Sequence, residues 1–291
     1  MSQDPLPAAR STLPYDPRID YQPRSGFLGG VGRKAIHVQA ELGSLFSTLG
    51  QAISAWFAPG RSARRTVHGV LLAQILFTGV QALALVSVIG ILIGATTVVQ
   101  TSLMVPGADA ELLGKILVAV VLRELAPLIT AIIVAGRSGT AIATELGNMK
   151  VNYEVLGLES LGIDPPRFIV LPRVLAAIVS VVVLMVYFGV VSVLSAALVG
   201  QEVLGTNPAE LRTGLAQALL PHDIILFLAK GVGLGAVLGW FACHYGLRVR
   251  TSPTEVPRQA STAVVRSLLG CVLFDTALTV LFYWLSERPL H

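Results

Sequence analysis

The amino-acid sequence predicts an all-α, polytopic membrane protein with one interfacial N-terminal helix and five transmembrane helices. Of the 291 residues, 54% are hydrophobic and only 13% are charged, whereas soluble domains carry about 25% charged residues. Five apolar runs also reach the roughly 20 residues that an α-helix needs to cross a bilayer. These runs cover about 69–98, 113–147, 168–200, 222–246 and 263–286.

The segment before the first run divides into two parts. Residues 1–35 contain five prolines among arginine, serine and glycine residues, without the apolar stretch of a signal peptide, so we expect a disordered cytoplasmic tail. In residues 36–60, large apolar side chains recur at helical spacing, which predicts an amphipathic helix in the cytoplasmic interface. They are Leu42, Leu45, Phe46, Leu49, Ile53 and Trp56.

The distribution of basic residues predicts the orientation of the spans. Lysine and arginine gather before the first run, between the second and third, and between the fourth and fifth, whereas the other side offers only Lys115, Arg212 and Arg288. Cytoplasmic loops carry the excess of basic residues, so the N-terminus is expected in the cytoplasm and the C-terminus outside. Leucines at 211, 215, 219 and 220 further predict a short helix resting on the outer surface.

Four ionisable residues lie deep within the runs, and they are candidates for a functional site. Arg123, Glu124, Lys230 and Asp275 fall at similar depths when each residue advances the helix by about 1.5 Å. Arg123 and Glu124 are adjacent and point about 100° apart, so we expect their partners to come from Lys230 and Asp275. The group is either an ionic network that fixes helix register or the polar lining of a cavity for an amphiphile.

Two further features of the runs concern packing and anchoring. Gly231, Gly235 and Gly239 are four residues apart and predict a smooth stripe against which another helix can pack closely. Arg137 lies roughly 21 Å along the helix from Arg123. We therefore expect Arg137 at the cytoplasmic interface, as an anchor that faces phosphate or bridges helices.

The segment between the second and third runs is expected to form a lever. Residues 148–161 combine apolar positions, including Leu158, with Lys150, Glu154 and Glu159, and then Gly162 and two prolines end the helical pattern. Such a short helix offers apolar and acidic groups to a soluble partner.

The sequence carries no signature of catalysis or cofactor binding. It lacks GxxxxGK[ST], HExxH, GxSxG and paired-cysteine motifs, so we predict no catalytic residue, no metal site and no bound cofactor. Any ATP would be bound by a separate subunit. The basic residues are scattered between apolar runs, and a nucleic-acid partner is therefore not expected.

Two stretches resemble the MlaE/YrbE family of ABC transporter permeases. They are RELAPLITAIIVAGRSGTAIATELGNMKV, which begins at Arg123, and LESLGIDPPRFIVLPRVLA, which begins at Leu158. The resemblance covers about residues 36–286. It departs from the family pattern at Tyr153, at Leu156-Gly157 and in the loop 255–261, which bears on the identity of the ATPase partner.

The resemblance implies that residues 61–291 form a five-span permease domain that acts as a homodimer in the bacterial inner membrane. Two cytoplasmic ABC ATPase subunits would dock on coupling helices at 148–161, with Glu159 matching the family glutamate. A periplasmic MCE-domain protein would exchange phospholipid or a related hydrophobic molecule with a cavity between the permeases. The four intramembrane charges match positions where the family carries charges in or near the transport core.

Two other functions stay open at the level of the sequence. An ion-coupled secondary transporter of an amphiphile could use the four charges as a relay, although no inverted repeat is visible and the number of spans is odd. An integral-membrane enzyme would need a nucleophile or metal constellation, which the sequence lacks.

Overall fold

The computed structural model describes residues 61–105, 109–162, 165–250 and 252–286, and these ranges contain helices and no strand. Five helices are long and apolar enough to cross a membrane, which confirms the predicted fold class. The predicted tail at 1–35 and interfacial helix at 36–60 lie outside the described residues. The spans are Thr78–Met104, Ala110–Val151, Phe168–Glu202, Pro221–Leu247 and Glu255–Trp284.

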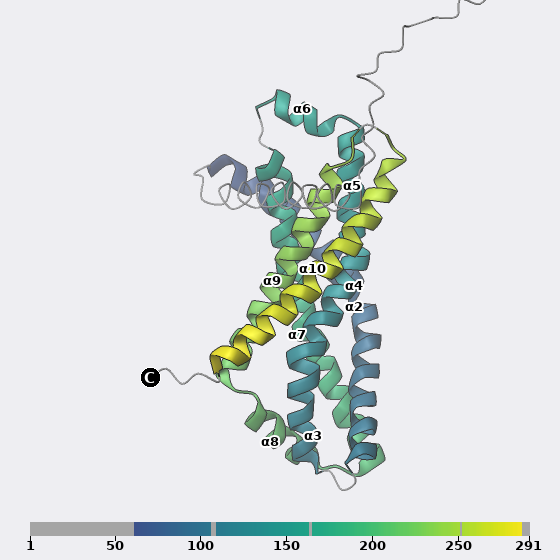
Figure 1. The fold of residues 1–291 in the computed structure, drawn as a ribbon, viewed down its shortest axis with the longest axis vertical. Coiled ribbons are helices and arrows are strands. Elements are labelled where there is room, and N and C mark those ends of the chain that lie inside the picture. The colour runs from purple at the N-terminus through teal and green to yellow at the C-terminus, as the bar shows by residue number, and fades with distance from the viewer. Residues whose placement is uncertain (1–60, 106–108, 163–164, 251, 287–291) are drawn as a thin grey trace, which may run out of the picture. The chain divides into compact units, whose positions relative to one another are not determined.

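The described ranges contain twelve helical segments (Figure 1). In chain order these are α2 (Arg61–Met104), α3 (Ala110–Ile116), η1 (Leu117–Leu125), α4 (Ala126–Val134), η2 (Ala135–Gly139), α5 (Thr140–Val151), α6 (Glu154–Ser160), η3 (Pro166–Val170), α7 (Leu171–Leu204), α8 (Pro208–Ala218), α9 (Pro221–Leu247) and α10 (Glu255–Ser286). Segments η1, η2 and η3 are π-helical.

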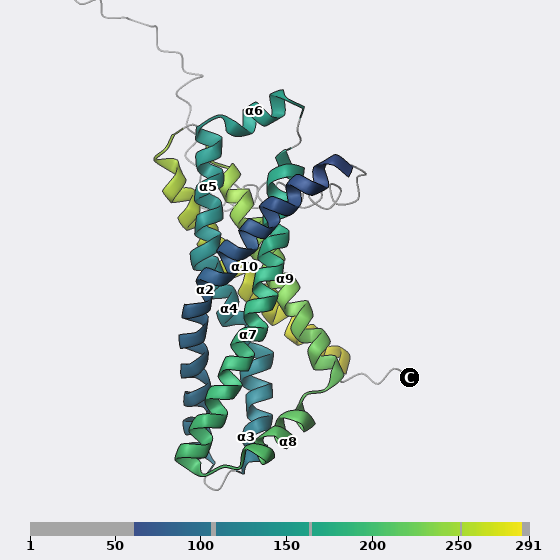
Figure 2. The same cartoon turned by 180° about the vertical axis from the view of Figure 1, so that it is seen from behind.

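The second span is the central element of the bundle. It runs without interruption from α3 to α5, and its middle segment α4 packs against α2, α7, α9 and α10 (Figures 1 and 2). Six of the nine residues of α4 are buried. Two π-helical segments lie within this span, so the extra length of the second apolar run is accommodated by local widening of the helix as well as by extension.

The predicted glycine stripe forms the contact between α9 and α7. A Cβ atom built at Gly235 would lie 2.5 Å from the Cα of Ile178, and one at Gly239 would lie 2.9 Å from the Cα of Val174. At Gly231 the nearest atom would be the Cε of Met185, at 2.8 Å. The absence of side chains at these positions therefore allows the two helix backbones to approach closely.

Helix α8 packs against another helix more closely than the sequence suggested. Leu211 is buried and Leu215 is half-buried, as the leucine spacing predicts. However, α8 lies against α3, where Gly214 faces the backbone of Glu111 and Gly114 faces the backbone of Leu215. The helix therefore belongs to the bundle and does not simply rest on its surface.

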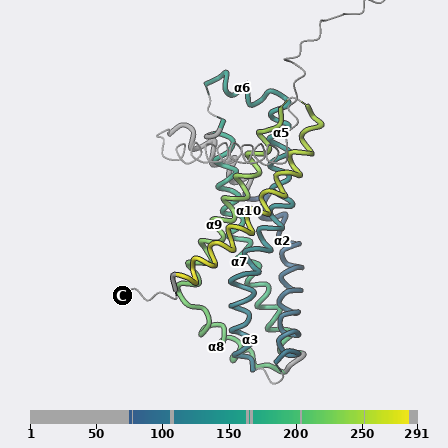
Figure 3. The backbone as a smooth tube through the Cα atoms, viewed as in Figure 1, coloured from purple at the N-terminus to yellow at the C-terminus, as the bar shows by residue number. Residues whose placement is uncertain are grey.

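The predicted lever at 148–161 consists of two pieces. Residues up to Val151 continue α5, and the chain then turns at Tyr153, whose φ of 60° lies in the left-handed region. That conformation is costly for a bulky residue and ends the helix. Figure 3 shows α6 leaving the end of α5 after this turn. The short helix is therefore a separate element, held by Val155, which is buried.

The glycine stripe leads to a stability prediction. Replacing Gly235 with alanine should lower the free energy of unfolding by about 1–3 kcal/mol, because the new Cβ would overlap the backbone of α7. Gly157→Ala is the matched control, since a Cβ there meets nothing within 4 Å and alanine favours helix by up to about 1 kcal/mol. Unfolding in detergent titrated with SDS measures both, and equal stability of the two variants would contradict the packing role.

Candidate functional site

Three of the four predicted intramembrane charges meet around the ammonium group of Lys230, which has no exposed side-chain area. Its Nζ donates to Glu124 Oε2 at 3.0 Å and lies 3.1 Å from Asp275 Oδ1. Thr279 extends the cluster, with its hydroxyl 3.4 Å from Glu124 Oε1. The second, fourth and fifth spans are therefore joined by one charge cluster, in which Lys230 and Asp275 are buried.

Arg123 points to a different partner from the one expected. Its Nη2 donates to Asp223 Oδ2 at 2.8 Å, rather than pairing with Asp275. Asp223 is 3% exposed and lies in the first turn of α9, seven residues before Lys230, which corresponds to about 10 Å along the helix. Arg123 and Glu124 are adjacent, yet they bind two residues of α9, Asp223 and Lys230, that are about 10 Å apart along that helix.

Asp223 was missed by the sequence analysis because an aspartate in the first turn of a helix is common as a cap. Asp223 does have this local function, since its Oδ2 accepts the backbone N–H of Leu220 at 3.0 Å. The available signal was the arginine in the second span, for which the sequence offers no adjacent acid on the same face of its helix. A buried arginine requires an acceptor, and Asp223 is the nearest acid at the start of α9.

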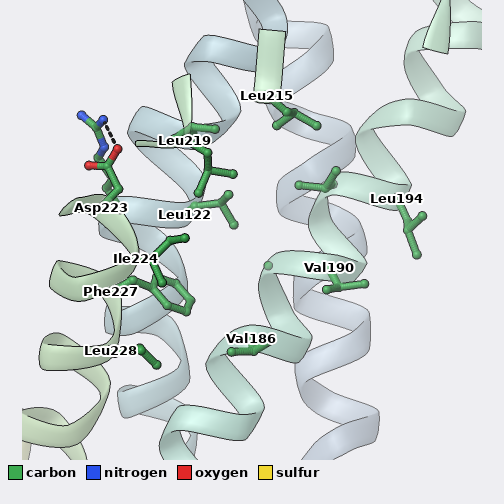
Figure 4. A pocket seen from close by; sticks show the side chains of 14 residues that line it. Leu122, Val186, Val190, Leu194, Leu215, Leu219, Asp223, Ile224, Phe227 and Leu228 are labelled. Atoms are coloured by element: carbon green, nitrogen blue, oxygen red, sulfur yellow. Dashed lines mark hydrogen bonds and ion pairs between the residues drawn. The ribbon is translucent and has the colours of Figure 1, made fainter. Parts of the chain in front are cut away.

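An apolar pocket of about 440 Å³ lies beside the Arg123–Asp223 pair. Figure 4 shows apolar side chains of α7 and α9, including Val190, Ile224 and Phe227, around this space, with Asp223 at its edge. Only Arg123 and Asp223 among the lining residues carry charge. The complete lining is Val118, Leu122, Arg123, Val186, Gly189, Val190, Val193, Leu194, Leu215, Leu219, Asp223, Ile224, Phe227 and Leu228.

Fourteen residues beyond Arg123 in the second span, Arg137 bridges two helices. Its Nη2 donates to the side-chain oxygen of Gln81 on α2, and its side chain is exposed. A second bridge lies nearer α6, where Arg173 Nη2 donates to Glu145 Oε1 at 2.8 Å. Both arginines therefore tie the α6 end of the second span to its neighbours.

The residues predicted for coupling take different positions around α6. Glu154 and Glu159 are exposed and Lys150 is half-buried, whereas Leu158 packs against the buried cluster that contains Ile142 and Leu146. The exposed apolar groups beside the acids are Tyr153 at 60%, Leu156 at 58% and Leu161 at 75%. Leu158 thus fixes α6 to the bundle, and Leu156 and Leu161 extend the surface open to another molecule.

The described residues hold no group of three or more histidine, cysteine, aspartate or glutamate side chains that could bind a metal ion. Cys243 and Cys271 are both buried free thiols. In this part of the chain the clustered charges form ion pairs between helices, and the helices form a membrane bundle with one ion pair beside an apolar pocket.

Comparison with known proteins identifies the family. The model of the Permease MlaE family matches residues 71–281. The chain is 30% identical over 256 residues to a probable ABC transporter permease protein of Rickettsia prowazekii, covering 87% of this chain and 96% of that protein. It is 26% identical over 261 residues to the intermembrane phospholipid transport system permease protein MlaE of Haemophilus influenzae, covering 88% and 97% respectively.

A plant relative shares the same region in part. The chain is 33% identical over 171 residues to the chloroplastic protein TRIGALACTOSYLDIACYLGLYCEROL 1 of Arabidopsis thaliana, an alignment that covers 59% of this chain and 49% of that protein. The family resemblance seen in the sequence is confirmed, and it favours an ABC permease over a secondary transporter or an enzyme. The chain belongs to the MlaE family of ABC transporter permeases, as a multi-pass membrane subunit that is not itself the ATPase.

Proposed function

We propose that this permease moves a phospholipid or a related hydrophobic molecule between the bacterial inner membrane and a periplasmic MCE-domain partner. The observation that carries this proposal is the apolar pocket of about 440 Å³ with one ion pair in its lining. Apolar walls with few polar groups suit an acyl chain or another hydrocarbon group. The relative from Haemophilus influenzae, whose name describes phospholipid transport, supports the same substrate class.

The exposure of Glu124 supports a homodimer. Its side chain is 40% exposed, although it lies within a membrane span and pairs with a fully buried lysine. A carboxylate facing hydrocarbon is strongly disfavoured, so the face of Glu124 requires a polar or protein cover. A second copy of the chain supplies this cover in the proposal, and the two copies enclose the transport cavity between them.

The α6 end of the bundle is proposed to bind the cytoplasmic ABC ATPase subunits. Here Glu159 lies beside the exposed apolar groups Leu156 and Leu161 on a short helix. Apolar anchors next to charged groups are typical of protein interfaces. ATP is bound by these partners, and the permease itself holds no cofactor. The N-terminus then lies in the cytoplasm, in agreement with the distribution of basic residues.

The pocket predicts the location of bound lipid. Val190→Trp should fill the space and reduce co-purifying lipid about tenfold, because excluding two buried CH₂ groups removes about 1.6 kcal/mol of binding free energy. Val183→Trp on the same helix is the matched control, since Val183 is 58% exposed and lies outside the lining. Mass spectrometry of lipids extracted from the purified transporter complex gives the readout. Undiminished lipid in the Val190 variant would contradict the assignment of this pocket.

The interface on α6 predicts a loss of ATPase binding upon charge reversal. Glu159→Lys should weaken association with the ATPase subunit about tenfold, because it places the wrong charge within the contact. Glu210→Lys is the control, since Glu210 is also exposed on a short helix, α8. Co-purification of the tagged ATPase with permease in detergent measures the effect. If both variants retain the ATPase equally, Glu159 does not contribute to docking.

A further inference from the structure

Pro127 removes a backbone donor from the middle of the second span. In an α-helix the carbonyl of residue 123 accepts the N–H of residue 127, but proline has no N–H and its ring also crowds that carbonyl. Pro127 is the second residue of α4, immediately after the π-helical segment η1. In the α-helical register the oxygen of Arg123 therefore has no N–H donor at residue 127, at a depth where bulk water does not replace it.

The Lys230 ammonium occupies the position of that donor. Lys230 Nζ donates to the backbone oxygen of Arg123 at 2.9 Å, the shortest of its three polar contacts. The other two contacts are with the carboxylates of Glu124 and Asp275. One ammonium group thus serves a backbone carbonyl and two acids at the same time, and it does so with no exposed side-chain area.

This contact fixes the segment that carries Arg123 and Glu124. The end of η1 is already in the wider register, because the N–H of Ala126 bonds to the carbonyl of Val121, five residues earlier. A helix with a widened turn followed by proline has fewer internal bonds to define its direction. The bond from Lys230 of α9 to the Arg123 carbonyl defines the direction of this helical segment through a contact with another helix. The guanidinium of Arg123 is thereby directed to Asp223 beside the apolar pocket.

We propose that Lys230 is a positioning residue whose ammonium replaces the backbone donor absent at Pro127, and that it thereby fixes the π-helical turn bearing Arg123 and Glu124. This role is distinct from that of a counter-ion for the two carboxylates. It depends on the carbonyl contact and is independent of which molecule is transported.

The two roles are separated by restoring the missing donor. Alanine at position 127 supplies an N–H that bonds to the carbonyl of Arg123 in the α-helical register, and it does not change any charge. The test therefore combines Lys230→Met with Pro127→Ala in the full-length protein and measures unfolding by SDS titration in phospholipid–detergent micelles. Asp275→Asn, alone and with Pro127→Ala, is the control, since it disturbs the ion pair and leaves the carbonyl contact in place.

Lys230→Met should lower the ratio of folded to unfolded protein by about 100-fold or more, because two carboxylates lose their cation and the Arg123 carbonyl loses a donor. Pro127→Ala should recover about tenfold of this loss, the size of one hydrogen bond regained, and should recover nothing from the Asp275 variant. Effects of Lys230→Met and Pro127→Ala that simply add, or equal recovery of the Asp275 variant, would overturn the proposal.

A local readout distinguishes positioning from general stability. Amide hydrogen exchange followed by mass spectrometry should show faster exchange in Leu117–Leu125 for Lys230→Met, a return towards the native rate with Pro127→Ala, and no change in Thr78–Met104. A uniform increase over both segments would contradict the proposal. If Lys230→Met cannot be purified, the same cycle is measured in the Asp275→Asn background, where fewer negative charges are left without a partner.

Discussion

The buried ammonium group of Lys230 is the constraint on which the arrangement of the second, fourth and fifth spans depends. A charge enclosed by protein within a membrane must be surrounded by acceptors, and these acceptors come from η1 and α10. The three helices cannot move independently without leaving a charge or a carbonyl unpaired. The glycine stripe on the same helix, beginning at Gly231, then allows α7 to approach from another side. Helix α9 therefore carries both the glycines that allow close packing and the lysine that pairs with the two acids.

The same helix also connects structure to the binding space. Asp223, in the first turn of α9, holds Arg123 at the edge of the apolar pocket, and the side chains of Ile224 and Phe227 line its wall. The Arg123–Asp223 pair and the cluster around Lys230 thus lie in different environments. The Lys230 ammonium has no exposed side-chain area, although Glu124 in the same cluster is 40% exposed. The Arg123 side chain is 21% exposed and borders the apolar pocket. The sequence alone left open whether the four charges are structural or line a cavity. The geometry places Lys230, Glu124 and Asp275 in contacts between helices, and Arg123 in the lining of the pocket.

Much of the fold could be predicted from the sequence because a bilayer imposes a simple rule of length and apolarity. The five spans and the packing function of Gly231, Gly235 and Gly239 follow from spacing alone. Asp223 could not be assigned, because its partner depends on how two distant helices align. Counting 1.5 Å per residue also assumes α-helical geometry, which η1 does not have. The contact of α8 with α3 likewise needs tertiary information, although Gly114 and Gly214 were visible as residues without side chains. The roles predicted for Glu159 and its neighbours stay predictions, since they concern a surface whose partner is a separate molecule.

Helix α6 is fastened to the bundle by Val155 and Leu158, which join a buried cluster that includes Cys243 of α9. Cys243 lies thirteen residues beyond Lys230 on the same uninterrupted helix, a separation of about 20 Å. Because α9 is a continuous helix, a small tilt of its Cys243 end displaces its Lys230 end. A tilt of about 5° over that length amounts to a displacement of roughly 2 Å. Such a shift is comparable with the reach of a single hydrogen bond. Helix α6 and the Lys230 cluster are therefore connected through one continuous helix, α9.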